Sequence, residues 1–112
     1  MAAIDPDIRR EQRDVVARLA QLGFVLPGTI TERTMRCGKQ RCGCANDPAQ
    51  RHGPYTQWTR TIDGKTVTKM LNRDQHARYQ AWFDDHRQLR DLTSELETLS
   101  IQAIIKAEGW GS

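Results

Sequence analysis

The feature that most constrains the fold is a long helical pattern in the C-terminal third of the chain. Apolar residues recur there at heptad spacing between Trp82 and Ala103, as they do in a coiled coil. Asn72 precedes the pattern, and Gln75 follows Asn72 by three residues, which is the spacing of a capping box. We predict one helix over residues 72–108, about 54 Å long, which exceeds the diameter of a domain of this size.

The apolar stripe of this helix needs a partner, and the sequence allows two. One is a second copy of the protein, which would give a symmetric dimer through a coiled coil. The other is an N-terminal helix over residues 5–23, which begins with Asp5-Pro6 as cap and first helical position and has Gly23 at its end. Because a helix of about 27 Å covers only half of the stripe, we favour the dimer.

Between the helices, β-branched and aromatic residues predict three strands. Ile30 to Arg36 forms the first, and Tyr55 to Ile62 and Lys65 to Leu71 form the others. Asp63-Gly64 joins the last two and is typical of a tight β-hairpin turn. The predicted fold is α+β, a single domain over residues 1–112 with a small three-stranded antiparallel sheet, an N-terminal helix and a long C-terminal helix.

A segment broken by glycines and a proline, between the first two strands, holds all three cysteines of the chain. Three cysteines and one histidine form an accepted ligand set for structural Zn²⁺. Free or redox-active thiols and small core residues are the alternatives, but glycine and cationic neighbours are typical of a surface knuckle, and the C-x-x-C pair of redox enzymes is absent. We predict a zinc knuckle within residues 29–71, with the ligands Cys37, Cys42, Cys44 and His52.

Charge is unevenly distributed along the chain, whose net charge is +3. Residues 29–73 hold nine basic and three acidic residues, a net +6, whereas residues 1–28 are neutral and residues 74–112 carry −3. This concentration indicates a nucleic-acid-binding face, with an ordinary solvated surface as the alternative. The basic residues that we assign to this face are Arg36, Lys39, Arg41, Arg51, Arg60, Lys65 and Lys69.

Two aromatic residues of the predicted hairpin, Tyr55 and Trp58, are candidates for stacking on a base. Their odd spacing places them on opposite faces of a strand, so we expect at most one to be exposed. We expect Trp58 to lie in the core.

The sequence contains no motif for catalysis. A phosphate-binding glycine loop, G-x-S-x-G and H-E-x-x-H are all missing, and Asp84-Asp85 has no nucleophile placed beside it by any motif. No long apolar segment indicates a membrane span or a signal peptide. We therefore expect a non-enzymatic, cytoplasmic protein.

The order RCGKQRCGC, then RHGPY, an aromatic strand, DGK and a long helix resembles a family of small bacterial and archaeal proteins, a domain of unknown function. The family signature is R-C-G-K-x-x-C-x-C followed by H-G-P-Y, and the resemblance covers about residues 28–99. Members are often encountered near mobile elements, which implies an accessory role in transposition or recombination. This sequence departs from the residues that are commoner in the family at two places. Gln40 stands where proline is frequent, and Thr56-Gln57 stand where aromatic residues are frequent.

The function that we predict is zinc-stabilised binding of nucleic acid, with DNA favoured over RNA. A homodimer through the C-terminal helix and a recombinase or transposase partner accompany this prediction. The main alternative is a protein–protein adaptor that acts through the long helix, with a purely structural zinc site. A thiol-dependent enzyme is the third and weakest alternative.

Overall fold

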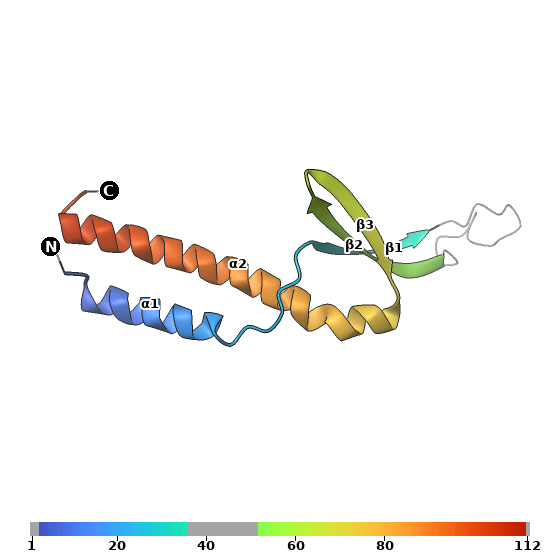
Figure 1. The fold of residues 1–112 in the computed structure, drawn as a ribbon, viewed down its shortest axis with the longest axis horizontal. Coiled ribbons are helices and arrows are strands. Elements are labelled where there is room, and N and C mark those ends of the chain that lie inside the picture. Colours follow the sequence, from blue (N-terminus) through green and yellow to red (C-terminus); the bar gives the residue numbers. More distant parts are fainter. Residues whose placement is uncertain (1–2, 36–51, 112) are drawn as a thin grey trace, which may run out of the picture. The chain divides into compact units, whose positions relative to one another are not determined.

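The structure is a computed structural model that describes residues 3–35 and 52–111 (Figure 1). It confirms the predicted α+β class, with an N-terminal helix, a three-stranded antiparallel sheet and a long C-terminal helix. The elements in chain order are α1 (Pro6–Leu19), β1 (Thr29–Met35), β2 (His52–Ile62), β3 (Lys65–Leu71) and α2 (Arg73–Glu108).

The chain divides into two compact units, and the division falls within α2. The helical unit consists of Met1–Leu26 and Trp82–Ser112, and the sheet unit consists of Pro27–Ala81. The organisation of residues 1–112 as a single domain stays a prediction.

Helix α1 begins where the sequence places its cap. The Asp5 carboxylate accepts hydrogen bonds from the backbone N–H groups of Asp7, at 2.8 Å, and Ile8, at 3.2 Å. The helix ends at Leu19 rather than at Gly23, because the chain tightens into turns after it. The backbone N–H of Gly23 instead donates a hydrogen bond to the Asp85 carboxylate of α2, at 2.9 Å.

The helical unit is built on the apolar stripe of α2, and α1 occupies that stripe. Val15 of α1 packs with Leu92 and Leu99 of α2, and these three residues are 2–8% exposed. Of the two predicted partners for this part of the stripe, the N-terminal helix is therefore the one that fills it. Ion pairs also join the two antiparallel helices, with Lys106 bound to Asp5 near one end and Arg18 bound to Glu95 at 2.8 Å further along.

Part of the predicted stripe lies outside this core. Ile101 and Ile104, which widen the pattern near the end of α2, are 58% and 48% exposed. Helix α2 then ends at Glu108, where Gly109 adopts a φ of +70° and the backbone N–H of Trp110 returns to the Ile105 carbonyl at 2.9 Å.

The start of α2 carries the predicted capping box. The backbone N–H of Gln75 donates a hydrogen bond to the Asn72 side chain at 2.8 Å, and the Gln75 side chain accepts one from the backbone N–H of Asn72 at 2.9 Å. The turn before β3 also follows its sequence signal, since Asp63 and Gly64 both have positive φ, +50° and +78°.

The sheet has the order β1-β2-β3, and both strand pairs are antiparallel. Trp58 in the central strand pairs with Ile30 of β1 and Lys69 of β3, which sets the register. At the far end of the β1–β2 pair, Met35 pairs with His52 after a register shift that follows Arg33.

One face of the sheet is partly covered from within the sheet unit. Thr56 is 7% exposed and its hydroxyl lies 3.5 Å from Nδ1 of His76 on α2. Further along β2, the Trp58 indole N–H is donated to the Pro27 carbonyl at 2.8 Å. Gly28 allows this approach, because it has a φ of +116° and a Cβ there would lie 2.6 Å from the Thr59 carbonyl oxygen.

Candidate nucleic-acid interface

Three of the predicted nucleic-acid-binding residues lie together on one face of the β2–β3 hairpin. Arg60 pairs with Val67, and Lys65 and Lys69 stand two residues to either side of Val67 on the same strand. Side chains of alternate residues, and those of directly paired residues, share a face of the sheet. Arg60, Lys65 and Lys69 therefore form one surface, which we call the cationic patch.

The aromatic side chain nearest this patch is Trp58. The Arg60 guanidinium carbon lies 4.2 Å from the centroid of the Trp58 ring, within cation–π range. Trp58 is half-buried rather than fully buried, so the prediction that it lies in the core holds only in part. The stacked ring limits the conformations of Arg60, whereas Lys65 and Lys69 are exposed.

The other predicted site residues lie outside the described residues or at their margin. His52 is the first residue of β2, and only its backbone is described. Among residues 3–35 and 52–111, no group of three or more histidine, cysteine, aspartate and glutamate side chains is placed to hold a metal ion. The predicted residues outside the described ranges are Arg36, Cys37, Lys39, Arg41, Cys42, Cys44 and Arg51.

The opposite face of the sheet holds Arg33, which the predicted nucleic-acid-binding face did not include, and Tyr55, one of the two predicted stacking residues. Arg33 of β1 and Tyr55 of β2 are Cα partners, so both side chains lie on the face away from the cationic patch. Both are exposed, Tyr55 by 39%. Their alternation with Glu32 and Thr56 is a sequence signal for this face, but their pairing depends on a register that spans the cysteine segment.

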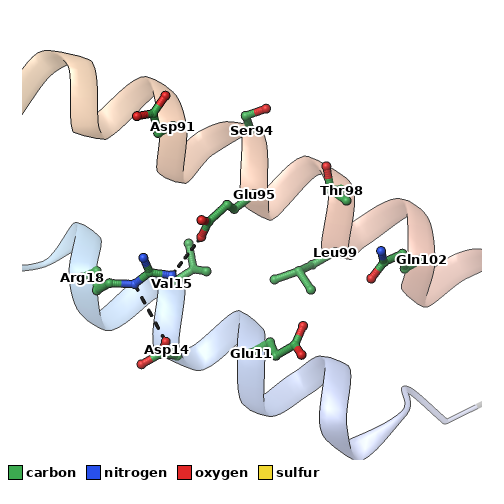
Figure 2. Close-up of a pocket in the computed structure, with 10 residues that line it drawn as sticks. All are labelled: Glu11, Asp14, Val15, Arg18, Asp91, Ser94, Glu95, Thr98, Leu99 and Gln102. Atoms are coloured by element: carbon green, nitrogen blue, oxygen red, sulfur yellow. Dashed lines mark hydrogen bonds and ion pairs between the residues drawn. The ribbon is translucent and has the colours of Figure 1, made fainter.

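The described surface of the helical unit has the opposite charge. A groove of about 520 Å³ lies between α1 and α2, and Figure 2 shows Arg18 held in it by ion pairs to Glu95 and Asp14. Glu11 and Asp91 also line it, so the groove is lined by four carboxylates and one guanidinium. Such a surface repels a phosphate backbone.

The net charges of the two units also have opposite signs. The sequence of the sheet unit has ten lysines and arginines against four acidic residues, a net +6. The helical unit has seven against ten, a net −3, and the two values sum to the +3 of the chain. Electrostatic attraction for a polyanion is therefore concentrated in the sheet unit.

Residues 5–81 match the model of a protein family described as Domain of unknown function (DUF6788). The chain belongs to this family. The match confirms the resemblance to a domain of unknown function, although it begins before α1 rather than near residue 28 and ends at Ala81, the last residue of the sheet unit.

Neither the search of curated proteins nor the search of solved structures gave a match. In the described part of the chain, neither helix has a segment of sufficient length and apolarity to cross a membrane.

Proposed function

We propose that this DUF6788 member is a non-enzymatic nucleic-acid-binding protein of the cytoplasm that uses its sheet unit as the binding surface. The observation that carries the proposal is the cationic patch, in which Arg60, Lys65 and Lys69 share one face of a two-stranded hairpin. The paired strands of the hairpin set the spacing of these side chains, which favours contact with successive phosphates. The net +6 of the sheet unit supports the same function.

The proposal includes one zinc ion bound by Cys37, Cys42, Cys44 and His52. Its structural support is the ladder at the end of β1 and β2, where the backbones of Met35 and His52 pair. His52, the last proposed ligand, is a member of this pair, and Cys37, the first proposed ligand, follows Met35 by two residues in the sequence. A metal site closing the connection between the two strands would stabilise the sheet unit directly.

Binding is to be measured by fluorescence anisotropy of labelled DNA and RNA, single- and double-stranded, at low and physiological salt, with zinc-loaded protein. We expect affinity to fall steeply with salt. The double variant Lys65→Glu, Lys69→Glu should weaken binding at least tenfold and reduce the log–log salt slope by about 2.

The matched control is Arg13→Glu, Arg90→Glu, which changes the net charge equally at two exposed positions of the helical unit. We expect it to retain most of the affinity. Equal losses in the two double variants would mean that only total charge matters, and no binding tighter than about 100 μM to any nucleic acid would contradict the proposed function.

The biological role that we propose is that of an accessory factor for a transposase, recombinase or other mobile element. It rests on the mobile-element setting that the family resemblance implies and on the fit between such a role and binding of DNA. Co-purification of the protein with a recombinase encoded beside it would support this role, and a mobile element that transposes equally well without the gene would contradict it.

A protein–protein adaptor acting through α2 is the second candidate function. It is favoured by exposed apolar side chains at the end of that helix, Ile101 and Ile104, and at Trp110, which is 55% exposed. These are also the residues through which a homodimer would form. Sedimentation should show dimers that Ile101→Asp, Ile104→Asp converts to monomers, and a wild-type protein that is monomeric at tens of micromolar would contradict the homodimer.

A further inference from the structure

The face of the sheet opposite the cationic patch is dominated by threonines. Each of the three strands carries a Thr-x-Thr pair on this face, and the register aligns Thr29, Thr59 and Thr68 in one row across the sheet. Thr31, Gln57 and Met70 form the adjacent row. We call this surface the threonine face, and it consists of Thr29, Thr31, Arg33, Tyr55, Gln57, Thr59, Thr61, Thr66, Thr68 and Met70.

The threonine face is open along its whole extent. All ten of its residues are exposed or half-buried, whereas the opposite face includes the buried Thr56. A sheet face that only needs water contact is commonly lined with charged side chains of both signs, but none of the ten residues here is acidic and one, Arg33, is basic. The surface therefore offers hydroxyl and amide donors and one positive charge to an anionic partner.

One end of this face combines an aromatic ring with the cation. Tyr55 is 39% exposed, and Arg33 is its direct cross-strand partner. Met70, 41% exposed, lies in the next row beside Gln57. An exposed ring on a sheet, next to a guanidinium group and polar donors, is the arrangement on which unpaired bases stack while the phosphate is bound alongside.

We propose that the threonine face binds single-stranded nucleic acid, with Tyr55 stacking on a base and Arg33 bound to the adjacent phosphate. The inference rests on the proposed function and specifies its ligand. A duplex keeps its bases stacked within the helix, out of reach of a ring on the surface of a sheet, so Tyr55 distinguishes single strands from duplexes. Lys65 and Lys69 lie on the edge strand β3, where the same strand of nucleic acid can pass from one face to the other.

The test compares a labelled single strand of about 15 nucleotides with its duplex, using zinc-loaded full-length protein and anisotropy. We expect the single strand to bind more tightly. Tyr55→Ala should weaken single-strand binding by about 5- to 150-fold and leave duplex binding unchanged. Tyr55→Phe should retain the affinity, because the ring is preserved.

The matched control is Trp110→Ala, which removes an aromatic ring that is 55% exposed in the helical unit and should bind like the wild type. If Tyr55→Ala does not fold, Tyr55→Leu removes the ring and keeps a bulky strand residue. Equal affinity for single strand and duplex, with no loss of affinity in Tyr55→Ala or Tyr55→Leu, would overturn this inference and leave the proposed function standing. Absence of binding to both nucleic acids would overturn both.

Discussion

The helical unit and the sheet unit are stabilised in different ways. All four buried hydrophobic residues in the described part of the chain, Val15, Phe83, Leu92 and Leu99, belong to the helical unit. The buried residue of the sheet unit in the same part is polar, Thr56. The helical unit thus has an apolar core of its own, while the sheet unit places its side chains on two surfaces and needs another source of stability.

Their surfaces differ as well. Carboxylates around Arg18 line the groove between α1 and α2, whereas Arg60, Lys65 and Lys69 form a patch on the hairpin. In the proposed function, the helical unit supplies stability and the sheet unit supplies the contacts with nucleic acid.

The largest effect that we expect is that of removing zinc. Because metal binding free energy becomes folding free energy when the site exists only in the folded state, Cys42→Ser or a strong chelator should unfold the sheet unit and abolish nucleic-acid binding. Circular dichroism should retain much of its helical signal, since the helical unit has its own core. Native mass spectrometry should find one zinc ion per chain.

The control for this experiment is His86→Asn, which changes a histidine of the helical unit that is not a proposed ligand. Metal analysis without zinc, together with thermal stability indifferent to the chelator, would contradict the zinc site.

The second effect concerns the helical unit alone. Leu92 is 2% exposed in its core, so Leu92→Ala should lower the free energy of unfolding by about 2–5 kcal/mol in a denaturant titration. Ile101→Ala, at a position 58% exposed on the same helix, should lower it far less. If the two substitutions were equally mild, the packing of α1 on this face of α2 would be wrong.

The third effect concerns the close contact between Gly28 and β2. Gly28→Ala adds a Cβ that meets the Thr59 carbonyl oxygen and the Trp58 ring, at a φ that L-residues rarely adopt, so it should cost about 1–3 kcal/mol of stability. Gly111→Ala is the matched control, because nothing lies within 4 Å of a Cβ there. A Gly28→Ala protein with unchanged melting temperature would exclude this approach of the chain to Trp58.

The smallest effect concerns the ion pair between Asp5 and Lys106. The hydrogen bond from Lys106, followed by those from the backbone N–H groups of Ile8 and Asp7, lowers the pKa of Asp5 below its usual 3.8. A carboxylate with a lowered pKa contributes stability above its unfolded pKa and loses it as pH falls through the folded one, so the contribution is present at neutral pH and disappears below about pH 4.

Asp5→Asn keeps a capping side chain and removes the charge, so it tests the ion pair together with the charge on the helix cap. Its melting temperature should be lower than that of the wild type at pH 7 by no more than about 4 °C, and the difference should vanish at pH 2. A difference that is the same at both pH values would show that the charge of Asp5 does not contribute.

Local signals in the sequence predicted the elements of this fold and most of their ends. Asn72 with Gln75 and Asp63 with Gly64 are each short-range devices whose geometry depends on neighbouring residues, and the structure contains both as predicted. The end of α1 was predicted less well, because Gly23 is held by Asp85, a residue far along the sequence.

Long-range pairing is what the sequence could not supply. The stripe around Leu92 and Leu99 has the same periodicity whether a second copy or α1 covers it, so periodicity alone cannot choose between them. Likewise, the pairing of Arg33 with Tyr55 depends on the register of β1 and β2 across the cysteine segment, and a shift of one residue would move each side chain to the other face.

The most direct test of the account is a two-dimensional amide NMR titration of zinc-loaded protein with a single-stranded oligonucleotide. We expect chemical-shift changes concentrated in the sheet unit, largest at Arg33, Tyr55, Lys65 and Lys69, with the residues around Leu92 and Leu99 nearly unchanged. Changes confined to α1 and the end of α2, or none at all in protein shown to carry zinc, would contradict it.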